Sequence, residues 1–282
     1  NGPAFRLIAV LDDGTVATFS PDDTQTAEVQ VVHNAAGFGT VDIYVLDPNG
    51  NKLDKLNDFP FRGSLVFDVP AGEDLEVTVN GSGSSGSGDS QVASVSSVNL
   101  SQGTFNQAFA VGEGNSDFAL QLKANQNESA GQSGNVDLLV GHQSPDAPTV
   151  DVLTRGVAAV DGFSYKDFAP SSGYLSVPED NYILRVGPDD NSSFVGSFSA
   201  PLQNLNLGGS TLTVLASGFL NPPSQSDPAF GLIAVPPANT STDANAVVEA
   251  SNADQNVTVL PSAPQGLIIN EFFADVNSGQ NP

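Results

Sequence analysis

Short runs of apolar residues, broken by polar residues and turns, follow one another along the chain. Leu75, Val77 and Val79 alternate with polar residues, which is the period of a strand that buries one face. No stretch sustains the 3.6-residue period of an amphipathic helix. Turn signals such as Asp47-Pro48-Asn49-Gly50-Asn51 separate the runs at roughly 8–12-residue spacing. The pattern predicts an all-β protein built from sandwiches of packed sheets.

One stretch of this pattern occurs twice. His33 stands nine residues before Asp42, and His142 stands nine residues before Asp151. The two copies keep one offset, because 142 − 33 = 109 and 151 − 42 = 109. A repeat of this size indicates two copies of one domain, and a chain of 282 residues is long enough for about two domains.

We therefore expect two tandem β-sandwich domains, over residues 25–131 and 132–245. An N-terminal hairpin in residues 1–24 and further strands in residues 246–282 flank them. Three more matches extend the repeat: Asp58-Phe59 with Asp167-Phe168 (168 − 59 = 109), Pro70 with Pro178 (178 − 70 = 108), and Leu75–Thr78 with Ile183–Val186 at the same offset of 108.

Both ends of the chain carry apolar strands that belong to neither domain. The run from Phe5 to Val10 repeats the closing strands at 118–122 and 230–235, so it is a surplus copy. An apolar strand with an open edge tends to pair with another chain. The alternative is a fragment of a longer tandem array, whose missing neighbour precedes Asn1. The residues that we expect to pair between subunits are Phe5, Leu7, Ile8, Val10, Leu267, Ile268 and Ile269.

The net charge of the chain limits the classes of partner that it can bind. Eight Lys and Arg residues stand against 32 Asp and Glu residues, so the formal net charge is −24. Nucleic acids and anionic membranes require basic patches, which this composition does not supply. The sequence has no Cys, which excludes disulfides and thiol nucleophiles.

The two His/Asp pairs, His33 with Asp42 and His142 with Asp151, are the most specific polar feature. In the structural interpretation each His bonds its Asp and ties the end of one strand to the next. The functional alternative is a catalytic dyad or half of a metal site. We favour the structural interpretation, because a triad needs a positioned nucleophile and a zinc site needs about three protein ligands.

Acidic loops offer candidate ligands for calcium. The carboxylates of Asp12, Asp13, Asp189 and Asp190 could hold Ca²⁺, which prefers clustered oxygen ligands, but solvated turns explain them as well. The run from Gly81 to Gly86 matches a dinucleotide-binding fingerprint formally, but it opens no helix. We therefore expect no cofactor other than Ca²⁺.

The pattern V-V-H-x-S-P-D-A-P-x-V-D-V resembles a bacterial domain of unknown function that occurs singly or in tandem on secreted and cell-surface proteins. The resemblance implies an immunoglobulin-like sandwich and implies no reaction. In the first copy Ala35–Gly39 replaces the S-P-D-A-P segment. The run 267–272 resembles the opening strand of lamin-tail-like modules. The residues that carry the main match are His142, Ser144, Pro145, Asp146, Ala147, Pro148, Val150 and Asp151, and in the first copy His33, Val41, Asp42, Pro70 and Gly72.

Together these features favour a structural extracellular protein, secreted or on the bacterial cell surface, that forms a filament or array by head-to-tail joining. Its partners are then copies of itself or neighbouring modules of a longer chain. The alternative is an adhesin-type module that recognises a glycan or a partner protein. The sequence brings together no acid, base and nucleophile, so we expect no enzyme.

Overall fold

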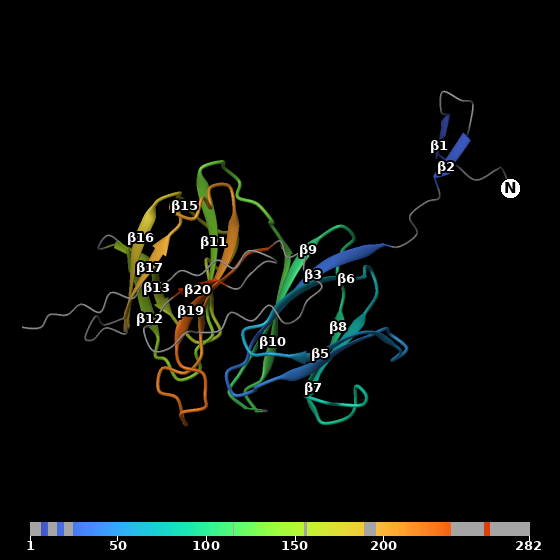
Figure 1. Ribbon diagram of the computed structural model, residues 1–282, viewed down its shortest axis with the longest axis horizontal. Coiled ribbons are helices and arrows are strands. Elements are labelled where there is room, and N and C mark those ends of the chain that lie inside the picture. Colours follow the sequence, from blue (N-terminus) through green and yellow to red (C-terminus); the bar gives the residue numbers. More distant parts are fainter. Residues whose placement is uncertain are drawn as a thin grey trace, which may run out of the picture.

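The structure is a computed structural model that describes residues 7–10, 16–19, 25–114, 116–154, 157–188, 196–237 and 257–259. Every regular element in this part of the chain is a β-strand. The strands form two tandem immunoglobulin-like sandwiches with extra strands at both ends, which confirms the predicted fold class (Figure 1). Among the residues described, there is no helix with the length and apolar character required to cross a membrane.

The first sandwich packs two four-stranded sheets against each other. One sheet has the strand order β10-β9-β3-β6 and the other has the order β5-β4-β7-β8. The strands are β3 (Thr26–Asn34), β4 (Val41–Leu46), β5 (Lys52–Phe59), β6 (Ser64–Pro70), β7 (Leu75–Gly81), β8 (Gln91–Val98), β9 (Phe105–Val111) and β10 (Ala119–Gln126).

The second sandwich repeats this plan. Its two sheets have the orders β14-β11-β18-β19-β20, with β15 also paired to β11, and β13-β12-β16-β17. The strands are β11 (Asn135–His142), β12 (Val150–Thr154), β13 (Val157–Phe163), β14 (Phe168–Ala169), β15 (Leu175–Pro178), β16 (Asn181–Pro188), β17 (Gly196–Pro201), β18 (Thr211–Ser217) and β19 (Gly231–Val235). The exact limits of the two domains, 25–131 and 132–245, stay predictions.

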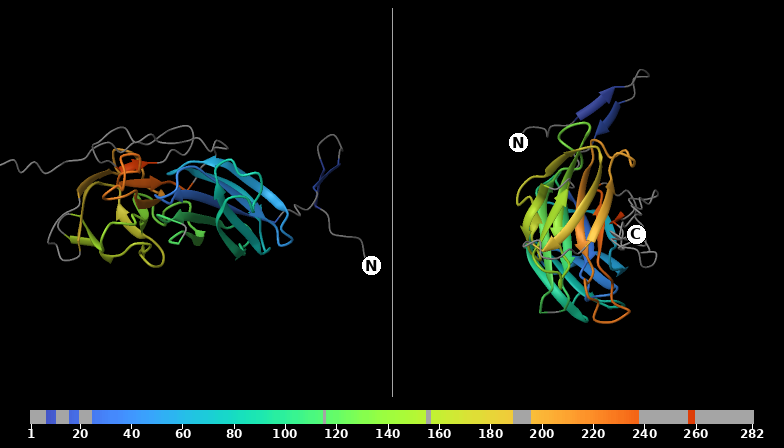
Figure 2. Two further views of the ribbon diagram at one scale, coloured as in Figure 1. Left: turned by 90° about the horizontal axis from the view of Figure 1, so that it is seen from below. Right: turned by 90° about the vertical axis from the view of Figure 1, so that its left-hand side faces the viewer.

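Strands from both ends lie outside this plan. β1 (Leu7–Val10) and β2 (Val16–Phe19) form the predicted antiparallel hairpin, which stands apart from the sandwiches beyond the first one (Figures 1 and 2). β20 (Val257–Val259) pairs in parallel with the outer edge of β19. The predicted pairing residues Phe5, Leu267, Ile268 and Ile269 lie outside the described residues.

The strand registers confirm the repeat in one place. Thr26 faces Pro70 in the first sandwich, and Asn135 faces Pro178 in the second. Since 135 − 26 = 109, the two prolines occupy equivalent positions, as the sequence predicts.

The match of Asp58-Phe59 with Asp167-Phe168 is wrong. Phe59 faces Val41, and the residue that faces the equivalent Val150 is Phe163. Asp58 and Gly162, which precede these phenylalanines, both have positive φ, 50° and 59°. The true offset here is 163 − 59 = 104, because the hairpin that joins the paired strands is shorter in the second copy.

The match of Leu75–Thr78 with Ile183–Val186 is wrong by one residue. Val45 faces Val77, while the equivalent Thr154 faces Leu184, so the offset is 184 − 77 = 107. A shift of one residue exchanges the two faces of a strand. Ile183 accordingly points outward and is 48% exposed, whereas Leu184 packs on the core of the second sandwich.

The four sheets stack as four layers along the long axis of the molecule. In Figure 1 the sheet with β12 and β16 is followed by that with β11 and β19, then by that with β3 and β9, and last by that with β4 and β7. Figure 2 shows the same order from another side. The central strands of the two middle sheets are therefore buried on both faces. β9 shows this directly, since all seven of its residues are buried.

Candidate functional site

The first histidine closes the end of β3. Its Nε2 lies 2.8 Å from the carbonyl oxygen of Gly39, and its Nδ1 accepts from the backbone N–H of Ala35 at 3.4 Å. These partners select the neutral tautomer with the proton on Nε2. His33 lies against the rings of Phe59 and Phe61, and this burial lowers the pKa of His33 from its usual 6.5 to about 4.

The second histidine has the same surroundings. His142 Nε2 lies 3.0 Å from the carbonyl oxygen of Pro148, and the ring contacts Phe163 and Tyr165. Burial lowers the pKa of His142 as well. Its Nδ1 is buried and has no hydrogen-bond partner in the described part of the chain. Each histidine thus fixes the loop that leads to the next strand.

The two aspartates do not bond these histidines, so the predicted His/Asp pairing is wrong. Asp42 accepts from the N–H of Asp58 at 2.8 Å, from the N–H and hydroxyl of Ser84 at 2.9 and 2.7 Å, and pairs with Lys55 Nζ at 3.0 Å. Burial alone would raise the pKa of Asp42, but these bonds outweigh it and lower the pKa. Asp151 accepts from the N–H of Gly162 at 2.8 Å. Both aspartates therefore anchor hairpins and loops.

Neither arrangement supplies a reaction centre. The contact with Tyr44 and the ion pair with Asp42 raise the pKa of Lys55, so its amine stays charged and is no nucleophile. Each neutral histidine faces a loop carbonyl, and no hydroxyl of a Ser or Thr is among its bonded partners. Within the described residues there is also no group of three or more His, Asp or Glu side chains that could hold a metal ion. The calcium candidates Asp12, Asp13, Asp189 and Asp190 lie outside the described residues.

In the second sandwich the S-P-D-A-P segment is hydrogen-bonded to the loop that follows β18. The Ser144 hydroxyl donates to the carbonyl oxygen of Gly218 at 2.6 Å. The Asp146 carboxylate accepts from the N–H groups of Leu220 and Asn221, both at 2.6 Å. The first sandwich lacks this segment and instead packs Phe38 edge-on against Phe118, with ring centroids 5.6 Å apart.

The main feature that the sequence did not reveal is the contact between the sandwiches. Val32 and Phe109 of the first sandwich form one apolar cluster with Leu215 and Ile233 of the second. All four side chains are fully buried. In the sequence these four residues look like any other apolar residues of a strand. The usable signal was the run 108–111, where four apolar residues follow one another without the alternation of a half-buried strand.

Polar side chains surround this apolar cluster. Arg62 donates to the hydroxyl of Ser217 at 2.8 Å and to the carbonyl oxygens of Ser217 and Ala229 at 3.1 and 2.8 Å. Asn34 donates to Gln143 at 2.8 Å and accepts from the Ser217 hydroxyl. Burial without a carboxylate partner lowers the pKa of Arg62 to about 10, so the guanidinium stays charged at neutral pH.

A second polar chain crosses the same interface. Thr213 donates to Gln107 at 2.9 Å, and Gln107 donates to Gln30 at 2.7 Å. Gln30 in turn donates to Ser64 and to the carbonyl oxygen of Pro236 at 3.1 and 2.8 Å. At the rim, Lys166 forms an ion pair with Asp117 at 2.6 Å.

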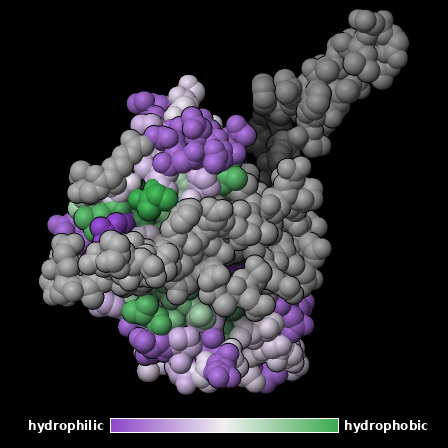
Figure 3. Space-filling model, turned by 60° about the vertical axis from the view of Figure 1, so that its left-hand side comes forward, coloured by the Kyte–Doolittle hydropathy of each residue, from purple (hydrophilic) through white to green (hydrophobic). Residues whose placement is uncertain are grey.

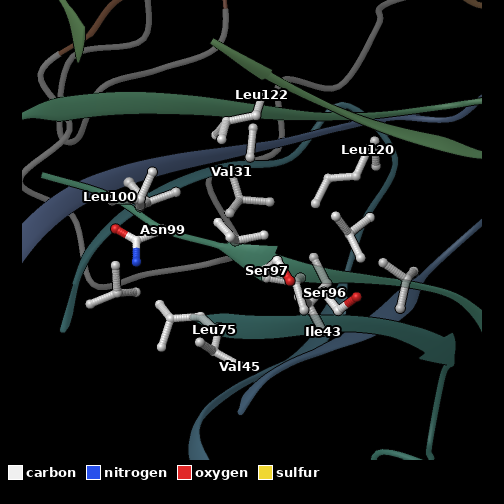
Figure 4. A pocket seen from close by; sticks show the side chains of 18 of the residues that line it. Val31, Ile43, Val45, Leu75, Ser96, Ser97, Asn99, Leu100, Leu120 and Leu122 are labelled. Carbon is white, nitrogen blue, oxygen red and sulfur yellow. The ribbon is translucent and has the colours of Figure 1, made fainter. Parts of the chain in front are cut away.

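An apolar cleft opens in the first sandwich, between its two sheets. The cleft has a volume of about 270 Å³ and is lined mainly by Val, Leu and Ile side chains (Figure 4). Leu120 and Leu122 of β10 and Val95 of β8 belong to its wall. Leu122 is 40% exposed, so the cleft reaches the surface.

The fold therefore defines a class of protein, the all-β tandem sandwich. Residues 27–153 match the model of a family described as a domain of unknown function, DUF4397. This match covers the first sandwich and the start of the second. No curated protein matches the chain.

Solved structures give distant likenesses only. The Bacillus anthracis TIE protein is 10% identical with a TM-score of 0.23, and the match covers 67% of this chain and 33% of that one. A family 26 carbohydrate-binding module of Eubacterium rectale Amy13K, solved with maltoheptaose, is 12% identical with a TM-score of 0.23, covering 67% and 92%. Family 41 carbohydrate-binding modules from streptococcal virulence factors reach 13% and 0.22, covering 67% and 93%. These scores carry no argument about function.

Proposed function

We propose that this chain is a structural building block of an extracellular assembly on a bacterial surface. Its two sandwiches act as one rigid body, and its terminal strands join copies head to tail. The observation that carries this proposal is the interface between the two middle sheets. Independent binding modules need no such interface, whereas a subunit that transmits force or sets a repeat distance does.

Rigidity follows from the composition of the interface. The central side chains of Val32, Phe109 and Leu215 are removed from water. Full burial of a side chain of this type stabilises the folded state by about 1.5–3 kcal/mol relative to leaving it exposed. The flanking bonds of Arg62 and Gln30 fix the register, since a sliding or hinged interface would leave buried donors and acceptors without partners. Inter-domain motion is the usual expectation for an interface without a hydrophobic centre, whereas this interface has the buried apolar cluster around Phe109 and Ile233 at its centre.

The terminal strands support head-to-tail joining. β20 adds to the outer edge of β19, so a strand from outside the sandwich already completes one of its sheets. Among the described strands, β1 pairs only with β2. A heterologous contact of this type does not close on itself and builds a linear chain of subunits.

Recognition of a glycan is the weaker alternative. Sugar-binding surfaces commonly use exposed aromatic rings, yet in the described parts of residues 25–237 no Phe or Tyr is exposed. On the face seen in Figure 3, both hydrophilic and apolar side chains reach the surface. Binding of this protein to a glycan array, lost on mutation of one loop, would favour the alternative.

Electron microscopy of the purified 282-residue chain tests the proposal. We expect linear polymers at high protein concentration, and we expect deletion of residues 1–20 to abolish them. If the intact chain stays a monomer at high concentration, or if the truncated chain forms the same polymers, strand-mediated joining is wrong.

A further inference from the structure

The two sandwiches differ in size at several equivalent positions around the cleft, and one of these pairs is Val95 and Phe198. Val95 of β8 faces Val77, while its equivalent in the second sandwich, Phe198 of β17, faces Leu184. Phe198 is buried in the core of the second sandwich, where the cavity equivalent to the cleft measures only about 70 Å³. The smaller Val95 leaves about 270 Å³ open in the first.

A second pair of equivalent aromatic residues also packs differently in the two sandwiches. Phe118 and Phe230 are equivalent residues that precede β10 and β19. Phe230 lies 6.0 Å from Phe198 and helps to fill the second cavity, whereas Phe118 turns to Phe38 in the loop that replaces S-P-D-A-P. Phe118 therefore packs on the first core beside Phe38 and is not part of the cleft wall, whereas Phe230 lines the second cavity.

The backbone of β8 also bends at this cleft. The pairing of β7 with β8 slips between Val95 and Val98, where Ser97 has a φ of 60°. This bulge disrupts the ladder beside the cleft, and it places Ser96, Ser97 and Asn99 on the cleft wall (Figure 4).

The outer edges of the equivalent strands β10 and β19 differ in the same way. β20 covers β19, with Val257 opposite Leu232 and Val259 opposite Ala234. The residues of β10 that correspond to Leu232 and Ala234 are Leu120 and Leu122, both in the cleft wall. No described strand pairs with the outer edge of β10.

We propose that this cleft and the open edge of β10 form the acceptor site for strand β1 (Leu7–Val10) of a second copy of the chain. The proposal deepens the proposed head-to-tail function, on which it rests, by naming the acceptor. All four residues of β1 are apolar, as the wall of the cleft is. β1 also stands apart from its own sandwiches, beyond the end of the first one, which suits donation to a neighbour (Figures 1 and 2).

Cross-linking of the full chain tests the donor and the acceptor together. The sequence has no Cys, so introduced thiols are unique. We mix an Ala9→Cys chain with a Leu122→Cys chain and add a short bismaleimide, which tolerates a shift of register. We expect a cross-linked dimer. The matched control is Leu53→Cys, an exposed residue on β5 in the other sheet, which should give several-fold less product.

Filling the cleft provides the second arm. Val95→Phe copies Phe198 of the second sandwich, so we expect a chain that folds with an unchanged or higher Tm but loses most of the cross-linked dimer. Undiminished cross-linking by this variant contradicts the proposal. Cross-linking within one chain of the doubly substituted Ala9→Cys, Leu122→Cys protein also contradicts the proposal. Preferential cross-linking of Val259→Cys to Leu122→Cys would show that β20, and not β1, occupies the cleft.

Electron microscopy of the same samples separates the two proposals. Polymers that form without this cross-link, and persist in the Val95→Phe variant, would overturn the acceptor site but keep head-to-tail joining. A cross-linked dimer without polymers would support the acceptor site and contradict the proposed assembly. Absence of both products would overturn both.

Discussion

His33 is buried among aromatic rings with no charged partner, and its pKa is therefore lowered to about 4. The sequence pattern singled out this residue and His142, but it assigned them the wrong hydrogen-bond partners. A spacing of nine residues places His and Asp on neighbouring strands, yet it does not say which face of the strand each side chain takes. The loop carbonyls of Gly39 and Pro148, which no pattern reveals, accept the histidine protons instead.

Stability should fall with acidification through the range set by His33. The folded-state pKa of about 4 lies below the usual 6.5, so between these values the unfolded chain binds more protons. The contribution of His33 to the free energy of unfolding is therefore complete above pH 6.5. It declines by on the order of 3 kcal/mol as the pH falls to about 4. Denaturant titrations at several pH values measure this decline.

His33→Gln is the matched control for the pH effect, because an amide can still donate to the Gly39 carbonyl but does not titrate. We expect the slope of stability against pH to drop by up to about 1.4 kcal/mol per unit. The remaining slope belongs to His142, whose pKa is also lowered. Asp42 adds to the loss only below its usual pKa of 3.8. A wild-type stability that does not change between pH 4.5 and 6.5 would contradict this reading.

Arg62 carries the polar part of the interface, since its guanidinium joins Ser217 and Ala229 of the second sandwich to a loop of the first. Arg62→Ala removes the donors to the buried Ser217, so we expect a loss of about 1–3 kcal/mol of unfolding free energy. Arg62→Lys should recover only part of it, because an ammonium cannot reproduce the planar fork. Equal stability of wild type and Arg62→Ala in denaturant titrations would show that the contact contributes nothing.

At the scale of elements, the sequence predicted strands and turns well, because alternation and Gly/Pro signals are local. The hairpin of β1 and β2 and the register of Pro70 and Pro178 are examples. The predicted matches of Asp58-Phe59 and Leu75–Thr78 with the second copy were wrong. Hairpins of unequal length shift the register between the copies, and the residue types do not reveal this shift. The pairing of the middle sheets could not be predicted, since it depends on contacts about 100 residues apart or more, such as Gln107 with Thr213.

Paired substitutions in β16 test the corrected register. Ile183→Ser should change the free energy of unfolding by no more than about 0.5 kcal/mol, because that side chain is 48% exposed. Leu184→Ser should cost about 2–4 kcal/mol, because that side chain packs on the core of the second sandwich. The reverse ranking in denaturation midpoints would restore the register that the sequence suggested.

For the whole molecule, the central claim is that four stacked sheets make the two sandwiches one body. The apolar cluster around Phe109 and Ile233 and the bonds of Arg62 and Gln30 tie the folding of each sandwich to that of the other. Two domains joined only by a linker would instead unfold independently. The same rigid body, repeated through strand exchange, would set the spacing of the proposed polymer.

Differential scanning calorimetry of the chain under conditions that keep it monomeric tests this claim most directly. We expect one endotherm in which the calorimetric enthalpy equals the van't Hoff enthalpy, as for a single cooperative unit. The Arg62→Ala variant should shift this endotherm to lower temperature without splitting it. Two resolved transitions in the wild-type chain, one for each sandwich, would contradict the account.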